Sequence, residues 1–262
     1  MASPLPRHLR TATEHAAIHA SLLDHVIDVR VDRTNGVRLH GNGRHRAKYA
    51  PGLATELLRL AGTRDVGDPM AGTGTLAWET GIKAALNDID LGMGRFLEPL
   101  KERGCEVTYT SADKISWQRE ACIFSPPYYP KADRRRPLAH NNKKRGPVVG
   151  FRDAYDADGP GFIGNPGGVD AILSYRRQMT RVYSHLRTMC GRMVVVTKNW
   201  TRLGTEMRLD LDTILMAQEA GWVCLERHGW QPPPSLWARF NAQRGGGVPV
   251  EDILVFERAE GR

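Results

Sequence analysis

The sequence lacks the features that mark several classes of protein. Its four cysteines (Cys105, Cys122, Cys190 and Cys224) stand far apart with no CxxC pair, which argues against a zinc site or a disulfide framework. We therefore expect reduced, structural thiols, no bound metal and a cytoplasmic protein. The chain has no signal-peptide pattern and no apolar run long enough to span a bilayer, so we expect no membrane partner.

Acidic side chains are outnumbered by basic ones. Lysine and arginine total 37 against 29 aspartates and glutamates, for a formal net charge of +8. This sign of charge favours a polyanionic partner without choosing between DNA and RNA. A basic surface that serves solubility alone is the alternative. With 262 residues, the chain can bury the core of one α/β domain with additional segments.

A glycine-rich turn occupies residues 68–75, with the sequence Asp-Pro-Met-Ala-Gly-Thr-Gly-Thr. It is typical of a strand end that bends into a helix, since Gly72 and Gly74 allow a tight turn and close approach of a ligand. Free N–H groups at the helix start favour an anionic ligand group. The lysine of the GxxxxGK[ST] phosphate-binding loop is missing, which argues against a nucleoside triphosphatase. The full GxGxxG pattern is missing too, so this turn alone is a weak signal.

A proline turn follows about fifty residues later. The apolar run 121–124 indicates a buried parallel strand, and it ends at Ser125-Pro126-Pro127-Tyr128. Two successive prolines fix φ and remove two N–H donors, which leaves a stiff turn with outward-pointing carbonyls. The sequence thus predicts two specialised turns, each at the end of a strand.

Together these stretches resemble a known family. Asp68–Thr75 resembles the cofactor motif D-P-F-x-G-x-G-T, and Ser125–Tyr128 the catalytic motif [DNS]-P-P-[YFW], of S-adenosylmethionine-dependent nucleic-acid amino-methyltransferases. The resemblance implies a Rossmann-like α/β fold over about residues 45–258: a seven-stranded, mostly parallel sheet with an antiparallel last strand and helices on both faces. It also implies S-adenosyl-L-methionine as cofactor. The cofactor-binding residues of the turn would be Asp68, Pro69, Met70, Ala71, Gly72, Thr73, Gly74 and Thr75.

Three further residues are candidates for cofactor binding. Residues 44–53 resemble the segment H-x-x-A-K-[FY]-x-P, which would place Lys48 near the cofactor carboxylate; a solvated surface lysine is an equally ordinary interpretation. Asp88 lies 20 residues after Asp68 at the end of a predicted strand, where it can accept hydrogen bonds from ribose hydroxyls. We prefer it to Asp90, for which the alternative is a helix cap. The resemblance puts Asp113 by the adenine amino group, with a turn aspartate as the alternative.

The implied chemistry is a direct methyl transfer. An exocyclic amine is a poor nucleophile because its lone pair is delocalised into the ring. The Ser125 hydroxyl and the Pro126 carbonyl can accept its two hydrogens and aim the lone pair at the sulfonium methyl group. Pro127 stiffens the turn, and Tyr128 would stack on the base, which in a duplex must first leave the helix. The chain has no Pro-Cys dipeptide, which separates it from ring-carbon cytosine methylation.

The chain divides into an N-terminal extension, 1–44, and a methyltransferase domain, 45–262. Residues 131–170 form an insertion rich in Gly, Pro, Asn and charge, which predicts a mobile loop. Beside the catalytic motif it favours phosphate binding, with a solvated flexible loop as the alternative. The connection 226–251 mixes aromatics with arginines and is a second candidate for target recognition, although such aromatics more often pack. The nucleic-acid-binding candidates are Lys131, Arg134, Arg135, Arg136, Lys143, Lys144 and Arg145.

Hydrophobic patterning predicts the main elements. The predicted helices cover about 52–61, 76–85, 172–189 and 211–217. The predicted strands are 65–67, which leads into the glycine turn, 84–90, 106–110, 121–124, 192–197, 222–225 and 252–256, with a short extended piece at 29–31.

The first functional prediction is a site-specific DNA amino-methyltransferase of restriction–modification, phage or orphan type. A serine at the first position of the catalytic motif is similar to many N4-cytosine enzymes, so cytosine N4 is slightly favoured over adenine N6. Only about fifty residues separate the two motifs, too few for a target-recognition domain between them. Target sequence, oligomeric state and any partner nuclease are not readable.

Three alternatives remain open. A tRNA guanine-N2 methyltransferase shares the fold and a [DN]-P-P-Y motif, but usually carries a larger N-terminal RNA-binding domain than this chain offers. A protein or small-molecule N-methyltransferase is opposed by the basic loop and by serine at position 125. A binding module that has lost its activity is opposed by the intact motifs.

Overall fold

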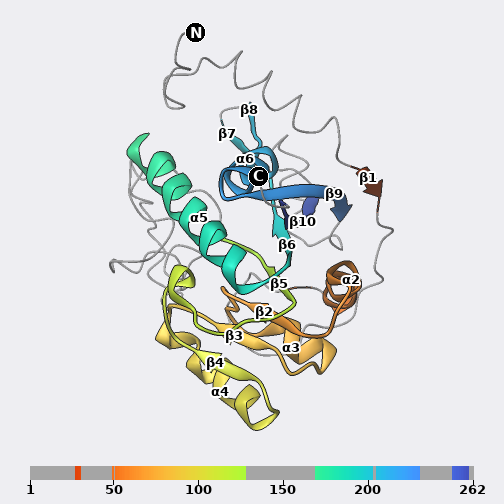
Figure 1. The fold of residues 1–262 in the computed structure, drawn as a ribbon, viewed down its shortest axis with the longest axis vertical. Coiled ribbons are helices and arrows are strands. Elements are labelled where there is room, and N and C mark those ends of the chain that lie inside the picture. The colour runs from red at the N-terminus through yellow and green to blue at the C-terminus, as the bar shows by residue number, and fades with distance from the viewer. Residues whose placement is uncertain are drawn as a thin grey trace, which may run out of the picture.

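The computed structural model describes residues 27–30, 49, 51–127, 169–202, 205–230 and 250–259. Their core is an eight-stranded sheet in the order β1-β9-β10-β6-β5-β2-β3-β4, and β7 and β8 form a separate hairpin (Figure 1). The sheet strands are β1 (Ile27–Arg30), β2 (Val66–Asp68), β3 (Ala85–Asn87), β4 (Glu106–Thr108), β5 (Ala121–Phe124), β6 (Arg192–Thr197), β9 (Trp222–Trp230) and β10 (Glu251–Arg258); the hairpin strands are β7 (Trp200–Arg202) and β8 (Thr205–Met207).

The predicted seven-stranded, mostly parallel arrangement is confirmed. β10 runs antiparallel to its neighbours β6 and β9, and the remaining strand pairs of the sheet are parallel. An eighth strand, β1, adds to it by pairing parallel with β9. The edge of β9 would otherwise present unpaired N–H and C=O groups, which a further strand satisfies. Part of the N-terminal extension therefore belongs to the sheet.

Five α-helices are described, and they cover both faces of the sheet (Figure 1). α2, α3 and α4 contribute to one hydrophobic cluster with one face of the strands, while α5 and α6 contribute to a second cluster with the other face. Their bounds are α2 (Pro51–Ala61), α3 (Thr75–Thr80), α4 (Gly94–Glu102), α5 (Val169–Met189) and α6 (Leu209–Glu219). Among the described elements, no helix combines the length and apolarity needed to cross a membrane.

Two helices differ from the sequence-based prediction. The helix expected over 76–85 is short, because Gly81 at its C-cap adopts a left-handed φ of 68° and ends it after Thr80. α4 was not predicted, since it begins at Gly94 and contains Pro99, two residues that usually signal a break. The four cysteines are free and buried, as expected for structural thiols.

Gly67 in β2 lies directly beneath the ring of Trp117. A Cβ atom built on Gly67 would stand 2.3 Å from the nearest ring atom, and Trp117 is only 4% exposed. The six-membered ring of the indole therefore packs closely against the backbone of the strand that leads into the glycine turn. Only glycine leaves room for this contact.

We predict that Gly67→Ala lowers the free energy of unfolding by about 1–3 kcal/mol, because the ring or the strand must shift in a packed core. Urea denaturation followed by tryptophan fluorescence measures it. Gly191→Ala is the matched control: a Cβ there would meet its nearest atom at an ordinary 3.6 Å, so we expect a change below about 1 kcal/mol. Equal losses in the two variants would contradict the close-packing argument.

Candidate functional site

The structure brings the two sequence motifs to the same edge of the sheet. β2 and β5 are parallel neighbours, with Val66 opposite Ala121 and Gly67 opposite Cys122. The Asp68 turn and the Ser125 turn therefore leave adjacent strands at their carboxyl ends. The sheet continues from this pair to β3 and β4 on one side and to β6 on the other. Crevices at such switch points are where open α/β sheets bind ligands.

The catalytic-motif residues are only partly described. Ser125 and Pro127 are half-buried and Pro126 is buried, so the proline turn is held against the sheet. Tyr128 lies outside the described residues, as do Lys48 and the basic residues proposed for nucleic-acid binding. Those assignments remain predictions from the sequence.

The glycine turn is fixed by its own hydrogen bonds. The Met70 N–H donates to Asp68 Oδ1 at 3.0 Å, and the Gly74 N–H donates to the Ala71 carbonyl at 2.8 Å. Gly74 has a φ of 67°, and a Cβ atom there would lie 2.5 Å from a methyl carbon of Leu100. Glycine at position 74 is thus required by the left-handed backbone and by packing against α4, in addition to any ligand.

The same turn is also held from β3. The Ala71 N–H donates to the Asn87 carbonyl at 2.8 Å, and the Gly72 N–H donates to Asp88 Oδ2 at 2.7 Å. Together with Met70 and Gly74, four N–H groups of the turn are therefore used within the protein. These four N–H groups therefore do not support the expectation that free N–H groups of the turn bind an anion.

The Asp88 carboxylate is oriented by two backbone N–H groups. It is half-buried, with Oδ2 accepting from the Gly72 N–H and Oδ1 accepting from the Asp90 N–H at 2.9 Å. Each carboxylate oxygen can accept two hydrogen bonds, so a group held this way can still accept a hydroxyl. Asp90 instead caps the 3-10 turn Leu91–Met93 by accepting from the Gly92 N–H, which confirms the cap alternative.

Asp68 is the most perturbed acid of the site. It is 2% exposed. Its burial, with the nearby charge of Asp88 adding to it, raises the pKa of its carboxyl from 3.8 to about 8, against the opposing hydrogen bond from Met70. Asp68 therefore lies buried within the turn and helps to fix its backbone through the Met70 N–H.

Asp113 has local partners. It belongs to the 3-10 turn Ala112–Lys114, and the Ser111 hydroxyl donates to its Oδ1. These contacts are those of the turn-aspartate alternative. Its half-buried position after β4 places it at the same edge as Asp88.

The prediction of a connection over residues 226–251 is partly wrong. Residues 226–230 continue β9, where His228 and Trp230 are 2% and 4% exposed. His228 Nε2 lies 2.7 Å from Glu226 Oε2, and Trp230 packs in the cluster beneath α2. These two aromatics pack in the core and cannot stack on a base. Residues 231–249 lie outside the described part of the chain.

Sequence reasoning missed a buried ionic network at the carboxyl end of β6. Arg227 Nη2 lies 2.8 Å from Asp252 Oδ1 and 3.1 Å from Asp210 Oδ2, and Arg208 grips Asp210 with two hydrogen bonds. Burial raises the pKa of Asp252 to about 6, with the Asp210 charge adding to it and Arg227 opposing it. The network fixes the start of α6 near the carboxyl end of β6, the strand that pairs with β5. The sequence signal was the pair of aspartates in the first turn of α6.

Sequence reasoning also missed Asn87, the last residue of β3, which is fully buried. Its amide bonds both the glycine turn and the end of β4. A single Asn before Asp88 carries no recognisable pattern, because its three partner residues, Pro69, Thr108 and Thr110, lie 18 to 23 residues away in the chain.

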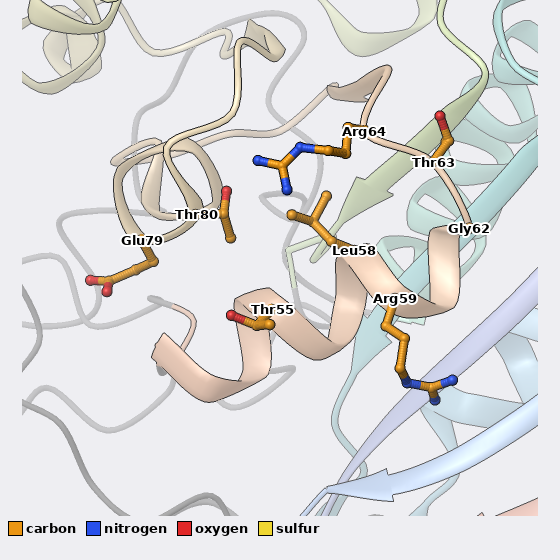
Figure 2. Close-up of a pocket in the computed structure, with 8 residues that line it drawn as sticks. All are labelled: Thr55, Leu58, Arg59, Gly62, Thr63, Arg64, Glu79 and Thr80. Atoms are coloured by element: carbon orange, nitrogen blue, oxygen red, sulfur yellow. The ribbon is translucent and has the colours of Figure 1, made fainter.

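A pocket of about 750 Å³ lies elsewhere, between α2 and the end of α3 (Figure 2). It opens near the amino end of β2, at the edge of the sheet opposite the two motifs. Its lining residues are Thr55, Leu58, Arg59, Gly62, Thr63, Arg64, Glu79 and Thr80, and none belongs to a motif. Arg59 is paired with Glu56. This pocket is therefore separate from the candidate site.

Comparisons with known proteins give structural similarity alone. No family model matches the chain, and no curated protein matches it. A candidate RNA methyltransferase from Pyrococcus horikoshii is 14% identical, with 95% of this chain and 100% of that chain covered and a TM-score of 0.46. Magnesium protoporphyrin IX methyltransferase from Synechocystis PCC 6803, with bound S-adenosylmethionine, is 11% identical over 85% and 88%, with a TM-score of 0.46. A tRNA (uracil-54, C5)-methyltransferase from Pyrococcus abyssi is 12% identical over 79% and 37%, with a TM-score of 0.42. At TM-scores below 0.5 these similarities assign neither family nor activity to this chain.

We predict that Asp68→Asn stabilises the protein at alkaline pH. The native carboxyl has a pKa of about 8 against an ordinary 3.8. The folded state therefore loses stability as pH rises from about 4 to 8, because the carboxyl ionises in the unfolded chain while it stays protonated in the folded protein. Asparagine removes that loss and can still accept the Met70 N–H. Urea denaturation at pH 9 should show a gain on the order of 2 kcal/mol that vanishes toward pH 4. A pH-independent difference would contradict the assigned pKa.

Proposed function

We propose that the protein is an S-adenosylmethionine-dependent methyltransferase that acts on an exocyclic amino group of a nucleic-acid base. One observation carries the proposal: β2 and β5 are adjacent parallel strands, so the Asp68–Thr75 turn and the Ser125-Pro126-Pro127 turn meet at one edge. Two turns with these residues would serve no common purpose if they lay on distant strands. Their adjacency provides a cofactor half and an acceptor half of one site.

The cofactor would lie across the carboxyl ends of β2, β3 and β4. Its methionine end would lie at the glycine turn and Lys48, its ribose at Asp88 and its adenine near Asp113. The residues fit this group, because the Asp88 carboxylate is already oriented by the Gly72 and Asp90 N–H groups. Bound there, the cofactor supplies an activated methyl group on a sulfonium.

The chain's own contribution is to orient the acceptor. The Ser125 Oγ and the Pro126 carbonyl accept the two amine hydrogens, Pro127 keeps the turn rigid, and Tyr128 stacks on the base. A nitrogen–carbon bond forms as the carbon–sulfur bond breaks, and the amine then releases a proton to solvent. No thiolate is required, and burial raises the pKa of Cys224 to about 12 and the pKa of Cys122 well above its ordinary range.

The acceptor within this class is inferred from sequence. Ser125 slightly favours cytosine N4 over adenine N6 in DNA, as in restriction–modification enzymes. The tRNA guanine-N2 alternative uses the same site chemistry, and RNA is named for two of the similar structures. A protein or small-molecule acceptor would need the same orienting turn. The experiment therefore offers DNA and RNA in parallel, and absence of label on both would point to a protein or small-molecule acceptor.

We expect methyl transfer from labelled S-adenosylmethionine to duplex DNA, single-stranded DNA or bulk tRNA, with at least a ~100-fold loss in Ser125→Ala and Tyr128→Ala. Digestion of the product to nucleosides identifies the methylated base. Thr55→Ala in the separate pocket is the control and should keep the activity. Label on tRNA alone would replace DNA by RNA. No label on any nucleic acid while the cofactor binds would overturn the nucleic-acid acceptor.

Cofactor affinity should depend on pH through Asp68. Its carboxyl, with a pKa of about 8 in the free protein, must ionise to attract a cationic ligand, so binding of S-adenosylmethionine should strengthen as pH rises from about 6 to 8. S-adenosylhomocysteine lacks the sulfonium charge and should show a shallower dependence. Isothermal titration calorimetry in buffers of different ionisation enthalpy measures the released proton. Asp68→Asn should abolish the difference between the two ligands.

A further inference from the structure

The Asn87 side chain joins two loops of the proposed cofactor site. It is fully buried, and its Nδ2 donates to the Pro69 carbonyl at 3.0 Å and to the Thr110 carbonyl at 2.9 Å. Its Oδ1 accepts from the Thr108 hydroxyl at 2.9 Å and from the Thr110 N–H at 3.0 Å. All four hydrogen bonds that a primary amide can make are therefore used.

This arrangement of partners satisfies an asparagine amide but not an aspartate carboxylate. The nitrogen faces two carbonyl oxygens and the oxygen faces two donors. An aspartate of the same shape would satisfy the donors but direct a second oxygen at two carbonyls, at a fully buried position. A buried polar group left without a hydrogen-bond partner lowers stability by more than the original hydrogen bond contributed.

The two loops serve opposite ends of the proposed ligand. Pro69 begins the glycine turn, at the methionine end, whereas Thr110 leads into the turn that carries Asp113, at the adenine end. The adjoining backbone repeats the connection, because the Asn87 carbonyl accepts from Ala71 and the Asp88 N–H donates to the Thr108 carbonyl.

We propose that Asn87 is a positioning residue that fixes the separation between the glycine turn and the 110–113 turn, so that both ends of one cofactor molecule are bound at once. The proposal rests on the proposed cofactor site. Asn87 itself touches no ligand, since it is buried beneath both loops. Its loss should weaken ligands that span the two loops more than ligands that use only one. A residue that serves stability alone would not distinguish them.

The test measures dissociation constants of S-adenosylhomocysteine and of adenosine for the full chain, wild type and variant, by calorimetry or ligand-detected NMR. In Asn87→Asp at pH 8 we expect affinity for S-adenosylhomocysteine to fall about tenfold or more and affinity for adenosine to fall no more than about threefold. Part of the loss should be recovered at pH 5, where a protonated aspartic acid can donate to one carbonyl.

Two further variants keep the test decisive. Thr108→Val removes one donor to Asn87 while preserving shape, and should weaken S-adenosylhomocysteine about two- to fourfold even if the Asn87 variants do not fold. Asn199→Ala is the matched control, because Asn199 is also a buried amide but bonds the Asp210 N–H at the start of α6. It should lower the melting temperature without changing the ratio of the two dissociation constants.

The outcomes separate this inference from the function on which it rests. Wild-type protein that binds neither cofactor nor product overturns both. Wild-type binding with equal losses for the two ligands in Asn87→Asp, or with no loss in Asn87→Asp and Thr108→Val, overturns the positioning role and leaves the proposed function standing. A selective loss for the spanning ligand supports it.

Discussion

The hydrogen bonding at the end of β3 is the constraint on which the rest of the site depends. Three loops leave the carboxyl edge of β2, β3 and β4, and each exposes main-chain groups that a sheet no longer satisfies. The Asn87 amide and the Asp88 carboxylate take up these groups from both sides. The loops are thereby held in one arrangement without help from regular secondary structure. A site built on such loops can be preorganised before any ligand arrives.

Charge is concentrated at the same edge, and it is costly there. Asp68 and Asp88 interact unfavourably beneath the glycine turn, and burial already raises the pKa of Asp68 to about 8. Asp210 and Asp252, at the other half of the edge, are offset by Arg208 and Arg227. These two arginines hold the carboxylates of the second pair together at the start of α6.

Local sequence predicted much of the fold, because periodicity and strand-ending residues are local signals. The helices at α2, α5 and α6 and the strand runs at β5, β6 and β10 follow the predicted ranges closely. Prediction failed where tertiary contacts override local preference. α4 forms despite Gly94 and Pro99 because Leu97 and Leu100 are buried against the sheet. β9 extends to Trp230 because strands on both sides supply its hydrogen bonds.

The sequence by itself determined the two specialised turns and their residue types, since glycine, proline and aspartate carry backbone and charge preferences wherever they occur. Only the tertiary structure decided that the turns are neighbours, because the pairing of β2 with β5 joins residues 55 positions apart. It also decided what each polar group does: Asp68 lies buried beneath its turn, Asp88 faces the edge with a fixed orientation, and His228 and Trp230 pack inside. Asn87 shows the reason most clearly. Its role is set by partners distant in the chain, and a linear pattern contains no record of distances in space.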